Sequence, residues 1–230
     1  LSDMNNPLLK KLSQKAPGTF QHSIQVANLA EAAAEKTGAN SLLVHTAALY
    51  HDIGKLKQPG FFIENMMGKQ SPHEVLSFEQ SANIIIQHVE EGVALAKKHK
   101  LPEVLIDFIR THHGTSTVQY FYRNYLKAFP EDQEVRARFS YPGPKPFSKE
   151  TGILMMADSV EAASRSLKEK TPEALTQLVD KIMDYQLSEG QLDHSDLTLS
   201  QMRIIRKVFK EKLLNMYHQR IEYPENSPNA

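Results

Sequence analysis

The stretch YHDIGK, residues 50–55, closes an apolar segment that begins at Ser41 and is predicted to form a buried helix. Its histidine and aspartate, His51 and Asp52, stand side by side where this helix is expected to end. Neighbouring residues on a helix project about 100° apart, because the helix has 3.6 residues per turn, and they rarely bind the same face of one ion. A carboxylate avoids this difficulty by offering one oxygen to each of two cations. The pair therefore hints at a site for two metal ions.

The composition of the chain limits the number of domains it can form and the kinds of partner and metal site it can have. Its 230 residues suffice for one large or two small domains. The 27 basic and 27 acidic side chains cancel, whereas a protein that binds a nucleic-acid polymer usually carries a basic excess or stripe. No nucleic-acid polymer is therefore expected as a partner. The absence of cysteine excludes disulfides and thiolate metal sites and suits a reducing compartment.

Membrane segments are also absent from the sequence pattern. No window approaches the roughly 18 consecutive apolar residues that a membrane-spanning helix needs, and no signal peptide is visible. The chain begins with Leu1 rather than methionine. We therefore expect a fragment of a longer protein, whose missing part can still hold a membrane anchor.

Almost every segment with a regular apolar pattern repeats at the helical spacing of three and four residues. Ser41 is expected to cap one helix, Ser77 and Gln80 to form the capping box of another, and Pro102 to stand at the first position of a third. Residues 56–76 and 130–148 are expected to be loops. Helices are expected at residues 23–36, 42–50, 77–87, 89–99, 102–112, 117–129, 149–168, 172–187 and 199–221. Because no strand pattern, repeat or linker is visible, the chain is predicted to be one all-α domain.

Five of the ten histidines, with two carboxylates, are predicted to stand where a helix begins or ends, so that their side chains can converge beyond the last turn. These candidates are His22, His51, Asp52, His88, His112, His113 and Asp158. His88 is expected at the junction of two helices. Any one of these histidines, taken alone, is more often an ordinary core or surface residue than a metal ligand. That ordinary role is expected for His45, which packs or supports a ligand, and for His73, His99, His194 and His218.

Longer motifs indicate that these seven candidates belong to one site. HDIGK, preceded by His22 and followed by the distant Asp158, resembles the core signature of the HD-domain phosphohydrolases. ALYHDIGKLKQPGFFIEN, HVEEGVALAKKHKLP, HHGTSTVQYFY and YPGPKPFSKETGILMMADSVEAASRSL are similar to the cytoplasmic catalytic domain of the PgpH-type enzymes, which are membrane-anchored and hydrolyse cyclic di-AMP. The resemblance implies an HD-domain helical bundle at residues 17–222, a connector from an upstream membrane region at 1–16 and a flexible tail at 223–230.

The resemblance also implies which residues bind metal. His22, His51, Asp52 and Asp158 are expected to hold one ion. His88, His112 and His113 are expected to hold a second, with Asp52 bridging the two. The imidazole and carboxylate donors alone are compatible with iron, manganese, zinc or nickel, and the resemblance favours two ions of iron or manganese. The stretch after His113 lacks the Gly-Tyr-Pro signature of HD enzymes that cleave cyclic di-GMP.

Hydrolysis of cyclic di-AMP to linear pApA by a bridging hydroxide is the activity that the resemblance implies, with Asp52 and Lys55 as catalytic residues. Lys55 is expected to hold a phosphate oxygen; alternatively, it satisfies the last carbonyls of its helix. Arg165 and Lys145 are weaker candidates for phosphate contact. Thr115, Ser116, Tyr120 and Tyr122 follow the paired histidines, and of these the two tyrosines are candidates to stack on an adenine or, alternatively, to pack in the core. The 56–76 loop is a candidate wall of the base pocket or, alternatively, packs its apolar residues beneath itself; these are Phe61, Phe62, Met66 and Met67.

Two other functions stay open at this point. One is an HD hydrolase of another nucleotide, such as cyclic di-GMP or a linear dinucleotide. The other is a nucleotide sensor that binds without cutting, although the complete ligand set argues against it. The fragment is expected to lie in the cytoplasm of a bacterium without touching the membrane that anchors its parent chain, and it can form an oligomer.

Overall fold

The protein is described here by a computed structural model that covers residues 1–66, 68 and 70–218. These residues form helices and short 3₁₀ turns, with one isolated bridge between Thr117 and Ser140 and no strand. The elements are α1 (Pro7–Lys15), α2 (Pro17–Thr37), α3 (Ser41–Tyr50), η1 (Ile53–Lys57), η2 (Pro59–Phe61), η3 (Ile63–Asn65), η4 (Pro72–Val75), α4 (Phe78–Lys98), α5 (Glu103–Thr111), α6 (Gln119–Ala128), η5 (Gln133–Phe139), α7 (Lys149–Ser166), α8 (Pro172–Ser188) and α9 (Leu199–His218). The predicted all-α fold is confirmed.

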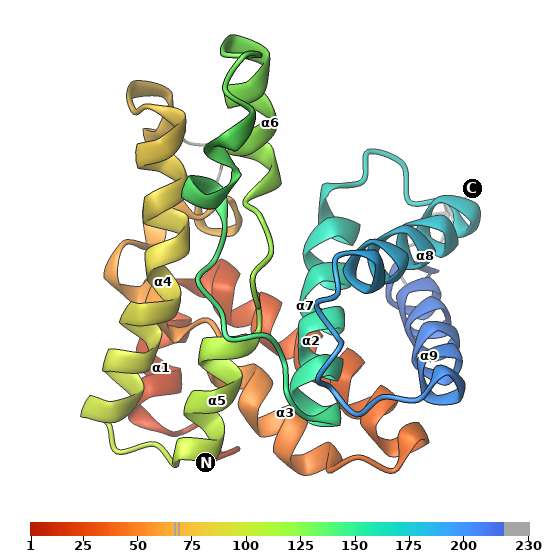
Figure 1. Cartoon of the computed structure of the whole chain (residues 1–230). Helices are drawn as coiled ribbons and strands as arrows, with labels where there is room; N and C mark the ends of the chain where they lie inside the picture. Colours follow the sequence, from red (N-terminus) through yellow and green to blue (C-terminus); the bar gives the residue numbers. More distant parts are fainter. Residues whose placement is uncertain (67, 69, 219–230) are drawn as a thin grey trace, which may run out of the picture.

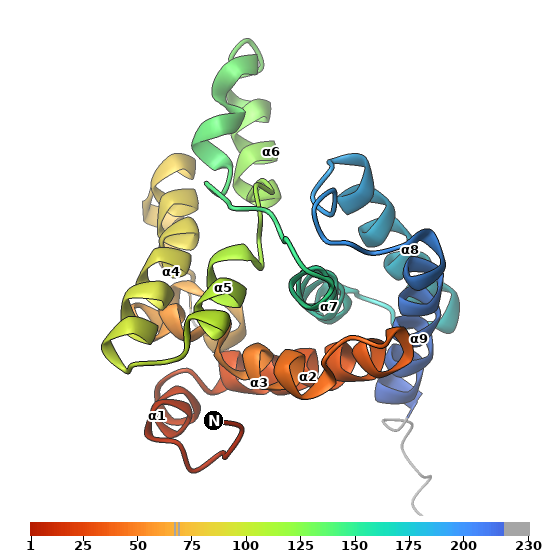
Figure 2. The ribbon, with the colours of Figure 1, turned by 60° about the horizontal axis from the view of Figure 1, so that its bottom comes forward.

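Helix α7 lies at the centre of the bundle, and the other helices surround it (Figures 1 and 2). Helices α2 and α3 cover one side, α4 and α5 a second, and α8 and α9 a third. The central position of α7 explains its composition, because its stretch from Thr151 to Asp158 is buried throughout. Burying one large aliphatic side chain contributes about 1.5–3 kcal/mol, so this helix anchors the core and fixes where Asp158 points.

Helix α6 and the turn η5 pack against the first half of α4 and form a protruding lobe (Figure 1). A separate small apolar cluster holds this lobe together, formed by Ala82, Phe121, Tyr125, Val135 and Phe139. The lobe faces α7 and α8 across the cavity described below. Two independent apolar clusters therefore build the two walls of that cavity.

Helix α1 packs onto the main core with Leu8, Leu9 and Leu12, each at most 1% exposed, and it contacts both α2 and η1. The predicted connector at residues 1–16 therefore contains a helix docked on the domain. Its link to an upstream membrane region stays a prediction. The predicted tail at 223–230 lies outside the described residues. Within the described part of the chain, no helix is long and apolar enough to span a bilayer.

Several predicted helix boundaries are wrong. The capping box of Ser77 and Gln80 is confirmed, but α4 continues unbroken to Lys98, so His88 lies inside a helix and not at a junction. His22 likewise lies inside α2. The N-cap of α3 is Asn40, whose side chain accepts from the Leu43 amide at 3.0 Å, and not Ser41.

The continuity of α4 has a packing reason. Gly92 weakens the helix signal in the sequence by about 1 kcal/mol relative to alanine, but it lies where η1 crosses α4. A Cβ added to Gly54 in η1 would lie only 1.8 Å from the carbonyl oxygen of His88 and 2.6 Å from the Gly92 nitrogen. These two glycines let the HDIGK stretch approach α4 closely, which places Asp52 beside His88.

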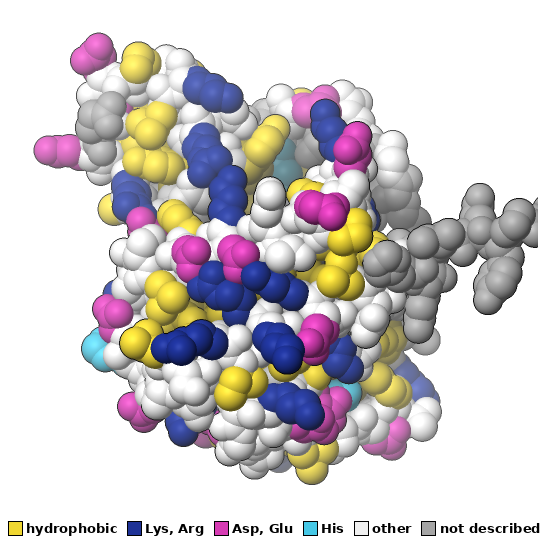
Figure 3. Space-filling view, turned by 90° about the vertical axis from the view of Figure 1, so that its right-hand side faces the viewer, with side chains coloured by type: hydrophobic (Ala, Val, Ile, Leu, Met, Phe, Trp, Pro, Cys, Tyr) yellow, Lys and Arg dark blue, Asp and Glu magenta, His cyan; other side chains and the backbone are white. Residues whose placement is uncertain are grey.

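The face formed by α8 and α9 carries charges of both signs, with lysines and arginines lying among aspartates and glutamates (Figure 3). Arg206 and Lys210 of α9 both pair with Asp180 of α8, at 2.9 Å and 2.7 Å. These partly exposed pairs each contribute little to stability, typically about 0–1 kcal/mol. They help to balance the charge of this face, which shows no single-sign stripe among the residues that the structure describes.

Candidate metal centre and adjoining pocket

The seven predicted ligands come together where five helices meet. His22 comes from α2, His51 and Asp52 from the end of α3, and His88 from α4. The remaining ligands are His112 and His113, at the end of α5, and Asp158, in α7. Potential ligand atoms lie within 4.8 Å of one another in three groups, which are His22–His51–Asp158, His51–Asp52–His112 and His88–His112–His113.

Asp52 lies between two groups of histidines, with one carboxylate oxygen toward each. Its Oδ2 lies 3.5 Å from the Nε2 of His22 and 3.4 Å from that of His51. Its Oδ1 lies 3.2 Å from the Nε2 of His88 and 3.7 Å from that of His112. This division is the arrangement that a bridging carboxylate requires.

Two polar atoms at the centre of the cluster lack a hydrogen-bond partner within the described residues. They are the Nε2 of His51 and the Oδ1 of Asp52, both completely buried. Leaving a buried polar atom unsatisfied costs about 1–3 kcal/mol. Metal ions on either side of Asp52 would satisfy both atoms, so the donor set fits the metal centre that the fold implies.

The other ring nitrogens are already engaged, which fixes how the imidazoles point. His51 and His112 each donate from Nδ1, at 2.7 Å, to the backbone carbonyl three residues earlier, those of Ala48 and Ile109. His88 makes the same contact with the Ile85 carbonyl. Their Nε2 atoms are thereby left for a metal, and such outer hydrogen bonds typically hold ligating histidines in place.

His22 is held in a different way, by a carboxylate that the sequence analysis missed. Its Nδ1 contacts Glu161 of α7, which is 2% exposed, while its Nε2 lies 2.9 Å from Asp158. Glu161 also accepts from Arg165 at 3.0 Å. Glu161 follows Asp158 by three residues, so both lie on one face of α7. That spacing was the available signal, but it gains meaning only once α2 is known to lie beside α7.

The electrostatics of the cluster separate charged from neutral groups. Burial raises the pKa of Asp52, but Lys55 and His51 offset this effect and hold the pKa well below its usual value.. Burial lowers the pKa of His51, but Asp52 and Asp158 outweigh burial and raise it to about 10. Burial, together with the neighbouring His112, holds the pKa of His113 well below its usual value. His113 is therefore a neutral imidazole, the form that binds metal.

Lys55 lies at the edge of the cluster. Its ammonium contacts the Oδ2 of Asp52 at 2.7 Å and Glu64 at 2.8 Å. Burial lowers the pKa of Lys55, but the two carboxylates outweigh it and raise the pKa above its usual value, so Lys55 stays charged. It does not satisfy the carbonyls of its own helix, which was the alternative role.

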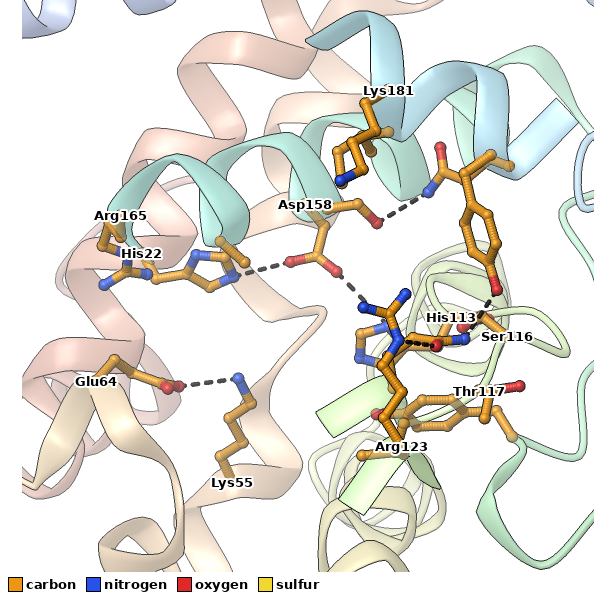
Figure 4. A pocket seen from close by; sticks show the side chains of 18 residues that line it. His22, Lys55, Glu64, His113, Ser116, Thr117, Arg123, Asp158, Arg165 and Lys181 are labelled. Carbon is orange, nitrogen blue, oxygen red and sulfur yellow. Dashed lines mark hydrogen bonds and ion pairs between the residues drawn. The ribbon is translucent and has the colours of Figure 1, made fainter. Parts of the chain in front are cut away.

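A cavity of about 460 Å³ opens beside the cluster. Its walls include the metal-ligand candidates His22, His113 and Asp158 (Figure 4). Tyr141, buried and missed in the sequence, stacks on His113 with ring centroids 4.3 Å apart. Cavities of this size are typical of small-molecule sites, and this one places a bound molecule against the ligand cluster.

The residues predicted to contact substrate divide into two groups. Lys55 and Arg165 line the cavity. Lys145 instead donates to the Gly190 carbonyl at 2.8 Å, and Tyr122 packs near Phe139 in the protruding lobe. The structure does not bring these last two residues to the cavity. The cavity is also lined by side chains that the sequence analysis did not select, among them Gln119, Arg123, Lys181, Tyr185 and Gln186.

The apolar residues of the 56–76 loop differ in burial, since Phe62 packs inward whereas Ile63 and Val75 are exposed. Phe62 is buried and lies edge-on to His88, with ring centroids 5.7 Å apart, and Phe61 contacts His73. This placement matches packing beneath the loop and not a base-pocket wall; Met67 lies outside the described residues. Thr115 bonds to Gln191, and Tyr120 is 72% exposed.

The histidines expected to have ordinary roles stay apart from the cluster wherever their side chains are described. His45 pairs with Glu31 at 2.8 Å, on the partly exposed outer side of α2 and α3. His99 caps the end of α4. The side chain of His218 lies outside the described residues.

Comparison with known proteins gives the cluster a family context. A model of the HD domain family matches residues 19–163. Over 98% of its length, the chain is 46% identical to the cyclic-di-AMP phosphodiesterase PgpH of Bacillus subtilis (strain 168) and 44% identical to PgpH of Listeria monocytogenes serotype 1/2a (strain 10403S). It spans 31% of the length of each relative. The crystal structure of the L. monocytogenes PgpH HD domain in complex with cyclic-di-AMP matches with a TM-score of 0.89 and 42% identity, covering 94% of this chain and 100% of that one.

Proposed function

Because the chain belongs to the HD domain family, we propose that it is a metal-dependent phosphodiesterase that hydrolyses cyclic di-AMP to linear pApA at a two-metal centre. The observation that carries this proposal is the position of Asp52, whose two oxygens face two separate sets of imidazoles. The two PgpH relatives are named for this activity, and the matching L. monocytogenes structure contains cyclic-di-AMP. Both support the choice of substrate.

The metal ions are assigned as in the sequence analysis. His22, His51 and Asp158 would hold one ion, and His88, His112 and His113 would hold the other. Asp52 would be shared between them. Two bound ions, iron or manganese, would supply a water of lowered pKa as the nucleophile and would neutralise charge on the phosphate.

The side chains of the protein prepare this site. Asp52 stays ionised, because Lys55 and His51 hold its pKa well below the usual value despite burial. Lys55 lies between Asp52 and the cavity and carries a charge that can hold a non-bridging phosphate oxygen. Tyr141 stacks on His113 and restricts the motion of that ring. Each of these groups is in place before a substrate enters, which is the preorganisation that phosphoryl-group hydrolysis relies on.

A turnover panel tests the substrate. The metal-loaded chain is incubated with cyclic di-AMP, cyclic di-GMP and linear pApA, and the products are separated by chromatography. We expect cyclic di-AMP to be cleaved fastest, with pApA as the accumulating product. Faster cleavage of cyclic di-GMP would identify the other hydrolase, and tight binding of cyclic di-AMP without product would identify a sensor.

The position of this chain within a longer protein follows from the same proposal. Residues 17–222 form the catalytic domain, which contains the matched segment 19–163. Residues 1–16 connect it to a membrane region, and the domain lies on the cytoplasmic side of a bacterial membrane. Fractionation of cells that express the full-length protein, followed by protease treatment of inside-out vesicles, tests this placement.

A further inference from the structure

Four cationic side chains line the cavity, but they differ in their partners. Lys55 pairs with Asp52 and Glu64, and Arg165 pairs with Glu161. Arg123 of α6 and Lys181 of α8 have no carboxylate within 4.0 Å in the part of the chain that the structure describes. Lys55 and Arg165 are therefore paired with carboxylates of the protein, whereas Arg123 and Lys181 line the cavity without a paired carboxylate among the described residues.

Arg123 is held in position by neutral groups. Its Nε donates to the Oε1 of Gln119 at 3.1 Å, and the Nε2 of Gln119 donates to the hydroxyl of Tyr185 at 2.8 Å. This chain of hydrogen bonds links α6 to α8 across the cavity (Figure 4). It uses Nε, and the two terminal nitrogens of the guanidinium have no hydrogen-bond partner among the described residues. An arginine in this state presents the planar pair of donors that suits a phosphate.

Arg123 and Lys181 enter the cavity from two different helices. Figure 4 shows Lys181 reaching in from the α8 side and Arg123 from the α6 side, both toward the space in front of Asp158. His22, His113 and Asp158 form the metal-facing wall of the same cavity. An anion that spans the cavity can therefore contact the metal-facing wall and the two unpaired cations at once.

A cyclic dinucleotide is an anion of this kind. It carries two phosphodiesters on opposite sides of one ring, and only one of them can lie at the metal centre in a given orientation. The other keeps its negative charge and needs a cationic partner elsewhere. We propose that Arg123 and Lys181 form a second phosphate subsite, which holds the non-reacting phosphate while the first is cleaved. This proposal rests on the proposed function.

The subsite explains how the cavity would prefer a substrate with two phosphodiesters over one with a single phosphodiester. Arg123 and Lys181 bind the phosphate that does not react, so they contribute equally to the ground state and the transition state. Removing such uniform binding raises KM and leaves kcat nearly unchanged. A dinucleotide with a single phosphodiester, such as adenylyl-adenosine, places its phosphate at the metals and gains nothing from the subsite.

The test compares Arg123→Ala, Lys181→Ala and the double variant with Arg138→Ala. Arg138 is an exposed cation of the protruding lobe that lies outside the cavity, 3.7 Å from Glu79. The measurements are kcat and KM for cyclic di-AMP and the inhibition constant of adenylyl-adenosine. Both side chains are exposed in the free protein. Each single variant is expected to raise KM about tenfold, because it loses one charge-assisted contact with the bound phosphate. We expect kcat and the inhibition constant to change less than about twofold, and Arg138→Ala to behave as wild type.

Three results would overturn the subsite. An unchanged KM in the double variant means that the two cations are only solvated surface charges. A fall in kcat with KM unchanged, or an equal weakening of adenylyl-adenosine, means that they act at the reacting phosphate instead. A wild-type protein that does not cleave cyclic di-AMP at all removes the proposed function and the subsite with it, whereas wild-type cleavage with unaffected variants removes the subsite alone.

Discussion

Glu161 offers a sharp test of how the metal centre is supported. It is buried, and it accepts hydrogen bonds from His22 and Arg165. Glu161→Ala leaves the Nδ1 of His22 without its acceptor, so the ring can rotate and its tautomer is no longer fixed. Loss of such an outer carboxylate typically weakens metal affinity 10–100-fold, which corresponds to about 1.4–2.7 kcal/mol. We expect a loss within this range for Glu161→Ala.

A conservative variant and a matched control make the result specific. Glu161→Gln keeps an oxygen that can accept from His22 but removes the negative charge, so a smaller loss is expected. Glu31→Ala removes the partner of His45, a histidine–glutamate pair at 2.8 Å that is partly exposed and lies outside the cluster. Its metal affinity should equal that of the wild type.

Competition with a chelator of known affinity measures metal binding, and thermal unfolding of the metal-free proteins shows whether each variant folds. The reasoning is refuted if folded Glu161→Ala binds metal as tightly as wild type. It is also refuted if Glu31→Ala weakens binding by the same factor, because the loss would then be a general effect of removing a carboxylate.

Three further predictions concern the bridging role of Asp52, the packing of η1 against α4 and the pH dependence of metal binding. Asp52→Ala should abolish hydrolysis of cyclic di-AMP, whereas Lys55→Ala should reduce kcat about 100-fold; equal losses in the two variants would count against the bridging role. Gly54→Ala should lower the free energy of unfolding in urea by about 1–3 kcal/mol, because the added Cβ would clash with the backbone of α4. Gly60→Ala is the control, since its added Cβ has open space around it, and it should change stability by about 0.5 kcal/mol or less. In the metal-free chain the pKa of His51 is raised to about 10, so this histidine is protonated near neutral pH. A metal must displace that proton, so metal affinity should rise from pH 6 to pH 8. A flat or falling affinity in chelator competition would contradict this.

The candidate metal ligands could be selected from sequence because several long motifs occur in the order typical of one family. His51 with Asp52, and His112 with His113, are adjacent pairs within those motifs, whereas each histidine taken alone is more often an ordinary core or surface residue. The placement of His88 was predicted less well. A junction of two helices was expected at His88, but α4 is continuous there, and the close approach of η1 to α4 is possible because Gly92 lies within that helix.

The residues that the sequence analysis missed depend on contacts between distant segments. Glu161 matters only because α2 lies beside α7 and brings His22 within reach. Arg123 and Tyr185 belong to one cavity only because α6 and α8 face each other across it. Tyr141 comes directly before a stretch rich in proline and glycine, and its stacking on His113 has no local signal. Periodicity predicts which helices form, but not which of their polar residues meet.

The proposed chemistry depends on two metal ions that share the carboxylate of Asp52. A crystal structure of the metal-loaded protein, with anomalous scattering recorded at the absorption edge of the bound metal, tests this arrangement. We expect two anomalous peaks per chain, about 3.5–4 Å apart, with one oxygen of Asp52 bound to each. A single peak, or two ions bound without Asp52 between them, would contradict it.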